Sequence, residues 1–412
     1  MKGRYFFSHE AGAYVQLFDA GLIMFQEGVG IAFEMHGAIF QCYQQLAAKS
    51  SLGYLVSDEG NGMKSGSKKS IFSRGGIYWS GQTGAMPVTG QMFLDYENLG
   101  EGSYLGLPVS PAKSIAGGLE QIFQMGRMYY KNGGTNAHEV HGAILAKFLA
   151  TGATGAWGFP VSNESDVKRN ASTIGKYNDF EHCTIYWSGS TGAFEVHGDI
   201  RQKYRDLNGP LGALGFPTSD EGNIPGAAGA ARFNSFQEGS ILWFGSQFNM
   251  HVCMPFKIYL GRINTKESEG AFRGQNDLYL RTLIRENGTQ VFNKRFPNSG
   301  DYGGKNIVDI NQKLNFIVKP NSPSKEIKFT VDVWESDWPD SDEHLGIYNK
   351  TLNMANAWGM AENNGVFNSG AFSSINSISW AVQPEVNINN LSINQKWWGL
   401  GRNPTTPSIS YN

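Results

Sequence analysis

The strongest constraint on this chain is an internal repeat with a period slightly above fifty residues. A short strand-like run, with an aliphatic residue or methionine first and an aromatic residue third, begins at residues 23, 77, 128, 185 and 241. The five runs are Ile23-Met24-Phe25, Ile77-Tyr78-Trp79, Met128-Tyr129-Tyr130, Ile185-Tyr186-Trp187 and Ile241-Leu242-Trp243. Such a period is typical of repeat architectures, in which each unit needs its neighbours to bury its apolar face.

Two further markers recur in the same register. A triplet that opens a helix-like stretch follows each of the first four runs: Met35-His36-Gly37, Val88-Thr89-Gly90, Val140-His141-Gly142 and Val196-His197-Gly198. A glycine turn occurs four times: Leu52-Gly53-Tyr54-Leu55, Leu105-Gly106-Leu107-Pro108, Trp157-Gly158-Phe159-Pro160 and Leu214-Gly215-Phe216-Pro217. Three markers in one register indicate a true repeat.

The segments AWGFPVSNE, LGALGFPTSDEG, GGIYWSGQTGA and YWSGSTGAFEVHG resemble the LGFP repeat, and the resemblance covers roughly residues 10–245. LGFP repeats are attached to bacterial cell-surface acyltransferases and hydrolases, occur in stand-alone secreted proteins, and are associated with anchoring to cell-wall polysaccharide. The resemblance therefore implies a glycan-binding module without catalytic activity. The first copy has Leu55 in place of proline and the fifth stops after its strand, so these two copies either bind poorly or only cap the array.

The repeat predicts a mainly β fold with short helices. Each unit combines a strand of period-two alternation, a glycine turn and a short helix, and it cannot bury its apolar face alone. We expect a five-unit repeat domain over residues 1–249 that closes into a propeller-like ring, with an open solenoid as the alternative.

The strand runs supply the first candidate ligand residues. Their third-position aromatics, Trp79, Trp187 and Trp243 among them, share a face with the first position and are expected to pack in the core. The middle tyrosines, Tyr78, Tyr129 and Tyr186, face the other way. If they are exposed, each offers an apolar ring and a hydroxyl to a sugar. Both sets are candidates for carbohydrate binding, with packing between units as the alternative for the tyrosines.

Glu-x-His-Gly occurs three times and supplies the second set of candidates. A carboxylate and an imidazole two residues apart can hydrogen-bond a hydroxyl-rich ligand, so Glu139, His141, Glu195 and His197 are candidate glycan ligands. The alternative is helix capping, because Thr89 replaces histidine in the second copy directly before a helix. No further metal ligands recur in register with these pairs.

Beyond Phe244 the alternating segments FKIYLGRI, DLYLRTLI, IKFTVDVW and NSISWAVQ predict an antiparallel β-sandwich over residues 250–385. The segment VDVWESDWPDSDEHLG carries six carboxylates, and oxygen ligands on a loop suit Ca²⁺. With Asp277-Leu278-Tyr279 it resembles the calcium-dependent lipid-binding sandwich of protein kinase C and synaptotagmin. That resemblance implies Asp277, Glu335, Asp337 and Glu343 as metal ligands; the alternative is a solvated acidic turn.

Composition narrows the function further. Lys plus Arg is 34 and Asp plus Glu is 36, so no strong field of either sign attracts nucleic acid. The three cysteines form no disulfide framework, and the chain contains neither a signal peptide nor an 18-residue apolar window, so we expect a soluble protein that acts outside the cell or at its surface. Motifs of the common enzyme classes are absent.

The sequence therefore predicts a multivalent carbohydrate-binding, lectin-like or cell-wall-glycan-binding protein that is not an enzyme. One alternative is a toxin or membrane-acting protein whose sandwich engages a membrane surface with calcium, and another is a purely structural surface protein. The Asn/Ser-rich tail over residues 386–412, with Trp397-Trp398, is expected to pack on a neighbouring domain or on a second subunit of a homo-oligomer.

Overall fold

The computed structural model describes residues 5–8, 13–26, 30–46, 51–227, 229–247, 249–266, 277–336, 342–359, 366–368 and 375–384 of the 412-residue chain. Its internal contacts divide it into two compact units, Met1–Glu195 and Val196–Asn412, and each is described by itself. The predicted domain boundaries at 249/250 and 385/386 stay predictions, and the tail over residues 386–412 lies outside the described residues.

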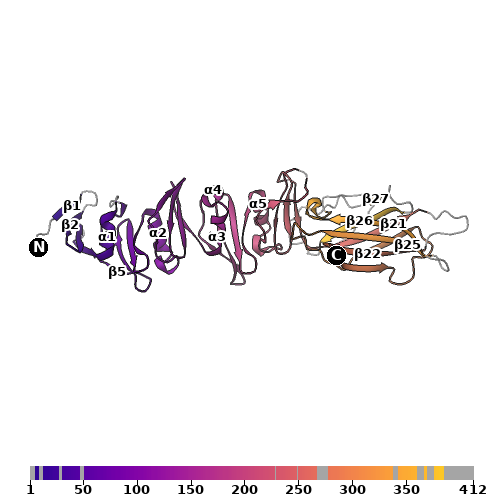
Figure 1. Ribbon diagram of the computed structural model, residues 1–412, viewed down its shortest axis with the longest axis horizontal. Helices are drawn as coiled ribbons and strands as arrows, with labels where there is room; N and C mark the ends of the chain where they lie inside the picture. The colour runs from indigo at the N-terminus through magenta and orange to yellow at the C-terminus, as the bar shows by residue number, and fades with distance from the viewer. Residues whose placement is uncertain are drawn as a thin grey trace. The chain divides into compact units, whose positions relative to one another are not determined.

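The first unit consists of four-stranded sheets in which the strands follow chain order (Figure 1). The sheets are β1 (Tyr5–Ser8), β2 (Ala13–Leu17), β3 (Gly21–Gln26) and β4 (Ala32–His36); β5 (Gly60–Asn61), β6 (Lys68–Phe72), β7 (Gly75–Ser80) and β8 (Gly84–Thr89); β9 (Lys113–Ile115), β10 (Gly118–Ile122), β11 (Gly126–Lys131) and β12 (Ala137–His141); and β13 (Ser165–Arg169), β14 (Ser172–Asp179), β15 (Cys183–Ser188) and β16 (Gly192–His197), whose last two residues belong to the second unit.

Short helices follow the sheets and connect each one to the next. They are α1 (Gly37–Gln45), α2 (Gly90–Asn98), the 3-10 turn η2 (Glu101–Ser103), α3 (Gly142–Ala150) and α4 (Ala153–Trp157). Helix α1 packs against β3 and β4 of its own repeat and against β7 and β8 of the following repeat; α2 and α3 repeat this arrangement with β11, β12 and β15. Each helix is thus shared by two sheets, and a sheet between two helices is covered on both faces.

The central strands show this two-sided burial. In β7, Ile77 belongs to the same core cluster as Ile39 and Phe40 of α1, the preceding helix. Its neighbour Tyr78 points to the opposite face and joins the cluster of Tyr96 on α2, the helix that follows. Both side chains are almost completely buried, so β7 separates two successive hydrophobic cores.

Each glycine turn packs beside the turn between the second and third strands of the sheet that follows it. In the third turn, the Phe159 backbone N–H donates to Oε2 of Glu181 at 2.8 Å, and Pro160 forms a bridge with Phe180. Gly158 has a φ of +71° and a ψ of −170°, a conformation that is essentially restricted to glycine. An added Cβ there would lie 2.5 Å from the same Glu181 oxygen, so the turn requires glycine for two reasons.

The other turns use equivalent side chains in place of Glu181. Gln124 accepts from the Leu107 N–H at 3.1 Å and Gln237 accepts from the Phe216 N–H at 2.9 Å. In the first turn, Ser73 Oγ accepts from the Tyr54 N–H at 3.3 Å. One polar residue per repeat therefore fixes the backbone of the turn.

The second unit begins with the end of one repeat and contains a further sheet. These elements are α5 (Gly198–Asp206), the 3-10 turn η3 (Gly209–Leu211), β17 (Gly222–Asn223), β18 (Arg232–Ser235), β19 (Ser240–Trp243) and β20 (Met250–Cys253). Helix α5 packs on β19, as the earlier helices do on their following sheets. The five predicted strand runs are therefore β3, β7, β11, β15 and β19, each the third strand of its own sheet, and this prediction is confirmed.

A β-sandwich follows in the same unit and is also confirmed. One sheet has the order β24-β21-β28-β27 and the other β23-β22-β25-β26. Their strands are β21 (Phe256–Thr265), β22 (Leu278–Glu286), β23 (Thr289–Phe296), β24 (Ile307–Lys313), β25 (Ile327–Glu335), β26 (Glu343–Leu352), β27 (Val366–Asn368) and β28 (Ile375–Pro384), with the 3-10 segment η4 (Met354–Gly359) after β26. The Trp380 indole N–H donates to Tyr348 Oη at 2.7 Å, which joins the two sheets in the interior.

The mainly β fold with short helices is confirmed, because strands dominate and the described helices have nine residues or fewer. Each of the seven described sheets is open and four-stranded, and none of them closes into a barrel. The arrangement of the repeat sheets in a closed ring stays a prediction.

Candidate functional site

The described side chains bring one polar cluster together at the junction of β12 with the next repeat. His141 Nδ1 lies 2.7 Å from Oε2 of Glu139, and His141 Nε2 lies 3.3 Å from Oε1 of Glu164. Lys176 Nζ lies 3.2 Å from the same Glu164 oxygen and 2.9 Å from Asp166. We call His141, Glu164 and Lys176, together with their counterparts in other repeats, the junction cluster.

Backbone hydrogen bonds explain why these residues meet. The Glu139 N–H donates to Asn163 Oδ1 at 3.0 Å, and the Glu164 N–H donates to Glu139 Oε1 at 2.7 Å. The Ser-Asn-Glu turn after the glycine turn thus lies along the outer edge of β12 and gives its backbone donors a partner. Since Glu139 is fully buried, it orients His141 and the turn and offers no surface to solvent.

The same cluster occurs in the first repeat. His36 Nδ1 lies 2.9 Å from Glu34 and His36 Nε2 lies 3.5 Å from Glu59. The Glu34 N–H donates to Asp58 Oδ1 at 2.9 Å, as Glu139 does to Asn163. The cation in the place of Lys176 is Lys68, whose charge opposes protonation of His36.

The second unit carries a third copy. His197 Nε2 lies 3.2 Å from Glu221 Oε1, and Arg232 Nε lies 3.9 Å from the same oxygen. Glu195, the counterpart of Glu139, is buried at 3% exposure. The Ser-Asp-Glu turn of this repeat, Ser219 to Glu221, matches the turns that end at Glu59 and Glu164.

At the junction after β8 the whole set is missing. Thr89 stands at the histidine position and Pro87 at the first glutamate position, while Ala112 and Leu119 replace the second glutamate and the cation. The histidine, both glutamates and the cation are thus lost together, which indicates that they act as one unit.

The predicted tryptophans lie directly beside the cations. In the strand registers Lys68 is opposite Trp79, Lys176 opposite Trp187 and Arg232 opposite Trp243, so each pair shares one face of its sheet. The three indoles are half-buried, so the expected core role is met only in part. The Trp243 N–H donates to Asp199 Oδ2 at 2.9 Å, which places this ring at the start of α5, where Asp199 lies two residues after His197.

For the middle tyrosines of the strand runs the packing alternative is correct and exposure to a ligand is wrong. Tyr78, Tyr129 and Tyr186 are 1%, 2% and 5% exposed, so none presents a ring face to a sugar. Two of their hydroxyls bond inside the protein: Tyr78 donates to Glu97 at 2.7 Å and Tyr129 to Glu120 at 2.9 Å. The physical reason at Tyr78 and Tyr129 is that helices cover both faces of their sheets, so a side chain on the second face is as buried as one on the first.

The helix-capping alternative is correct for where the histidines lie in the chain, but their side chains do not make the capping hydrogen bond. His36, His141 and His197 are the N-cap residues of their helices, yet none makes a side-chain cap hydrogen bond. At His36 and His141 both ring nitrogens face carboxylates instead.

The carboxylate partners of His36 and His141 favour protonation of these two imidazoles. The hydrogen bond to Glu139 raises the pKa of His141 above its ordinary value, against the opposing effect of burial. The hydrogen bond to Glu34 likewise raises the pKa of His36. The Lys176 ammonium, through its hydrogen bond to Asp166, holds the pKa of that carboxyl below its usual range. The clusters of His36 and His141 thus present charged donors and acceptors at a partly exposed surface.

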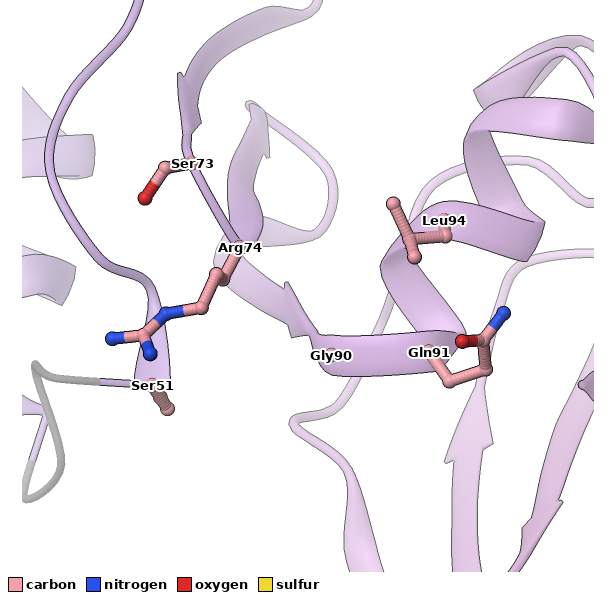
Figure 2. Close-up of a pocket in the computed structure, with 6 residues that line it drawn as sticks. All are labelled: Ser51, Ser73, Arg74, Gly90, Gln91 and Leu94. Carbon is pink, nitrogen blue, oxygen red and sulfur yellow. The ribbon is translucent and has the colours of Figure 1, made fainter. Parts of the chain in front are cut away.

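A separate cavity of 510 Å³ lies in the first unit between the first glycine turn and helix α2. Figure 2 shows Arg74 extending toward Ser51 on one side, while Gln91 and Leu94 project from α2 on the other. Its volume is within the roughly 300–1,000 Å³ of small-molecule sites. None of the sequence-predicted ligand residues lines it.

Three of the four predicted calcium ligands lie near one end of the sandwich. Glu335 is opposite Leu278, the neighbour of Asp277, and is also opposite Glu343. The Asp277 carboxylate accepts a hydrogen bond from the Gly304 N–H. Asp337 lies outside the described residues. Within the described part of the chain no group of three or more His, Cys, Asp or Glu is arranged to hold a metal, so calcium binding stays a prediction.

Sequence reasoning missed the second glutamate and the cation of the junction cluster. Glu59, Glu164 and Glu221 follow the glycine turn at fixed distance, and Lys68, Lys176 and Arg232 follow them in register. Their joint loss in the repeat that also lacks histidine was the available signal.

Comparison with solved structures gives only distant similarities. One domain of plant extended synaptotagmin 1 matches with a TM-score of 0.21 at 11% identity, over 32% of this chain and 96% of that domain. The extracellular domain of a protein described as a hybrid two-component system of B. thetaiotaomicron matches with a TM-score of 0.14 at 9% identity, over 85% of this chain and 44% of that one. No curated protein sequence matches. No described helix has the length and apolar character needed to cross a membrane.

The comparison with protein families gives a direct assignment. The LGFP repeat model matches four times in succession, at residues 52–101, 105–155, 158–212 and 214–252. Each match begins at or next to a glycine turn, and the first three include the helix that follows the sheet. Residues 52–252 of this chain are therefore a series of LGFP repeats.

Proposed function

We propose that the repeat domain is a multivalent carbohydrate-binding module without catalytic activity, and that its sites are the three junction clusters. One observation carries the proposal. Histidine, glutamate, cation and tryptophan recur together at the junctions after β4, β12 and β16, and all four are absent from the junction after β8. Packing alone would not require the joint loss of these four side chains.

The chemistry of the cluster suits a sugar. A lysine or arginine donates to ring and hydroxyl oxygens, the outer carboxylate retains acceptor positions, and a half-buried indole offers an apolar surface to the C–H face of a pyranose. The imidazoles stay partly accessible, with side-chain exposures of 60% at His36, 25% at His141 and 32% at His197.

Several such sites on one chain would raise the affinity for a polymer well above that of one site. A cell-wall or surface polysaccharide presents many equivalent units, so this geometry favours an extracellular or cell-surface location. The LGFP assignment agrees with that location, because these repeats occur in cell-surface proteins.

The decisive experiment uses threonine, the residue that the chain itself has at the histidine position of the junction after β8. Changing His36, His141 and His197 to threonine copies Thr89, which precedes an intact α2 helix. Each single variant should lose binding to an insoluble cell-wall polysaccharide several-fold, and the triple variant should lose it almost entirely. Co-sedimentation and a glycan array provide the measurements.

His182→Thr is the matched control, because His182 lies at a hairpin turn outside the clusters and should leave binding unchanged. A triple variant with native circular dichroism and unchanged affinity for the same glycan would refute the proposal.

The arrangement of the clusters in space belongs to the same proposal. A propeller-like ring would place the clusters around one axis, whereas an open row would space them along a polymer. Small-angle X-ray scattering separates these forms through the maximum dimension of the particle.

A second candidate function is calcium-dependent attachment of the sandwich to a membrane surface, as in a toxin. It is favoured by the three carboxylates, Asp277, Glu335 and Glu343, at one end of the sheet, because like charges in one place favour a shared cation. Titration calorimetry with calcium and co-sedimentation with anionic vesicles, with and without a chelator, test it. Absence of both heat and vesicle binding would exclude this candidate.

A further inference from the structure

An exposed tyrosine, Tyr104, lies against the junction cluster of His141. The centroids of its ring and of the imidazole are 5.0 Å apart, and the two rings meet edge to face at 76°. Tyr104 directly precedes the glycine turn of its repeat and is 40% exposed. An accessible aromatic ring therefore lies beside a group of hydrogen-bonding side chains.

The hydroxyl of Tyr104 is within electrostatic reach of the same cluster. Partial burial raises the pKa of this hydroxyl, and the carboxylates of Glu139 and Glu164 raise it further. These are the two carboxylates that face the ring nitrogens of His141. Ring contact and charge thus both place Tyr104 in the site of His141.

A second aromatic ring lies at the other end of this series of contacts. His141 Nε2 faces Glu164, which in turn faces Lys176. In the register of β14 and β15, Lys176 is opposite Trp187, which packs half-buried on the core of its repeat. The polar side chains of this cluster therefore have an aromatic neighbour at each end of the series, Tyr104 and Trp187.

Other repeats have a small residue in place of Tyr104. The residue directly before the glycine turn is Ser51 in the preceding repeat and Ala156 and Ala213 in the following ones. Ala156 belongs to the repeat that carries His197, so that repeat has a methyl group where the repeat of His141 has a phenol. The sites of His141 and His197 thus differ by one large aromatic side chain.

We propose that Tyr104 makes the junction cluster of His141 the strongest sugar site of the repeat domain, and that this site takes a neutral pyranose. The inference rests on the proposed function, because it assigns an aromatic platform and a ligand class to one of the three clusters. An accessible tyrosine offers an apolar ring to the C–H groups of a pyranose and a hydroxyl to its oxygens.

The charges of the cluster favour a neutral sugar over an acidic one. Its ion pairs join three carboxylates to two ammonium groups and one imidazole: Glu139, Glu164, Asp166, Lys168, Lys176 and His141. These groups carry no net charge when the imidazole is protonated and one negative charge when it is neutral. A uronic acid would have to displace a carboxylate from its cation, whereas sugar hydroxyls add hydrogen bonds and leave the ion pairs in place.

The test isolates this site in the full chain. Changing His36 and His197 to threonine leaves His141 as the intact member of the three clusters. Calorimetry measures binding of cellohexaose, chitohexaose and mannohexaose as neutral probes and of hexagalacturonic acid as the acidic probe. At least one neutral probe should bind this double variant, and it should bind more tightly than to the double variants that keep only His36 or only His197.

Tyr104→Ser, made in the double variant that keeps His141, copies Ser51 and should weaken binding of the neutral probe roughly three- to tenfold. Tyr104→Phe keeps the ring and should weaken binding less. Tyr14→Ser is the matched control, because Tyr14 is 43% exposed in the same unit but lies on β2 of the first sheet, and it should leave binding unchanged. Circular dichroism of each variant shows whether the fold is kept.

Three results would overturn the inference: unchanged affinity in Tyr104→Ser, equal losses in the serine and phenylalanine variants, or tighter binding of hexagalacturonic acid than of every neutral probe. Loss of polysaccharide binding in the triple threonine variant would still support the proposed function in each of these cases. A wild-type chain that binds neither the insoluble polysaccharide nor any probe would instead refute the proposed function, and this inference with it.

Discussion

The glycine of the repeat signature has a role that can be stated atom by atom. Gly53, Gly106, Gly158 and Gly215 have φ values between +69° and +77°, and an added Cβ would reach the side chain that caps the turn. The signature therefore encodes a backbone conformation together with a close approach, and the polar residue that caps it lies some twenty positions later in the chain.

Gly158→Ala should reduce the free energy of unfolding by about 1–3 kcal/mol, because alanine avoids this region of φ and ψ and its Cβ displaces the Glu181 carboxylate. Urea denaturation measures the effect. Gly155→Ala is the control: Gly155 lies in α4, an added Cβ there meets nothing within 4 Å, and the variant should be neutral or slightly more stable. Equal losses in both variants would contradict this account of the turn.

The junction cluster also makes a prediction about pH. Because the pKa of His141 is raised in the folded protein, its contribution to stability is fully present below the unfolded pKa of about 6.5. That contribution is lost as the pH rises through the folded pKa. Glu139→Gln should move the pKa of His141 back toward its ordinary value, as followed by NMR titration of the imidazole protons.

Glu238→Gln, a change at an exposed ion pair with Lys319 in the second unit, provides the reference titration. If the pKa of His141 were the same in Glu139→Gln and in the reference, the hydrogen bond between them would not be its main determinant.

At the scale of the element, the central strands show how far sequence reasoning reaches. The five runs are recognisable as strands from the sequence, because aliphatic and aromatic residues recur at fixed positions. Their equivalence from one repeat to the next is confirmed, since each is the third strand of its sheet. For Tyr78 and its counterparts the sequence leaves packing and exposure open, because alternation places them on the second face of the strand but does not show whether that face is covered. Ile-Tyr-Trp contains no charged residue between its apolar ones, which is typical of a strand buried on both faces.

The tyrosines are therefore structural. Tyr129→Ala should cost about 3–5 kcal/mol, since it removes a large buried ring that packs on Phe148. Tyr129→Phe should cost only about 1 kcal/mol, because it loses the hydrogen bond to Glu120 and keeps the ring. Thermal unfolding of the two variants separates packing from hydrogen bonding, and a neutral alanine variant would contradict the burial of this ring.

The site was harder to foresee than the strands for a related reason. Glu139 and His141 are neighbours in sequence, but Glu164 and Lys176 reach them only because the next repeat lies along the edge of β12. A contact between repeats leaves no periodic signal inside one repeat. The contact is indicated only when whole repeats are compared, because its side chains are all present at three junctions and all absent at the junction with Thr89.

At the scale of the whole molecule, the shared helices couple neighbouring repeats. Phe148 of α3 contacts Tyr129 of β11 on one side and stacks on Phe180 at 4.4 Å on the other. Phe148→Ala should therefore increase amide hydrogen exchange in both β11 and β15. Leu149→Ala, at an exposed position on the same helix, should affect neither strand. Exchange confined to one of the two sheets would contradict this coupling.

The position of the helices also means that the repeat defined by sequence differs from the unit defined by packing. The sequence repeat runs from a glycine turn to the end of a helix, as in residues 52–101, whereas each hydrophobic core spans a sheet, its own helix and the sheet of the next repeat. Every boundary between two sequence repeats therefore passes through a core. Recombination or protein engineering that exchanges a whole sequence repeat would consequently alter the cores at both of its ends, so the exchanged repeat must fit the apolar side chains of both neighbours.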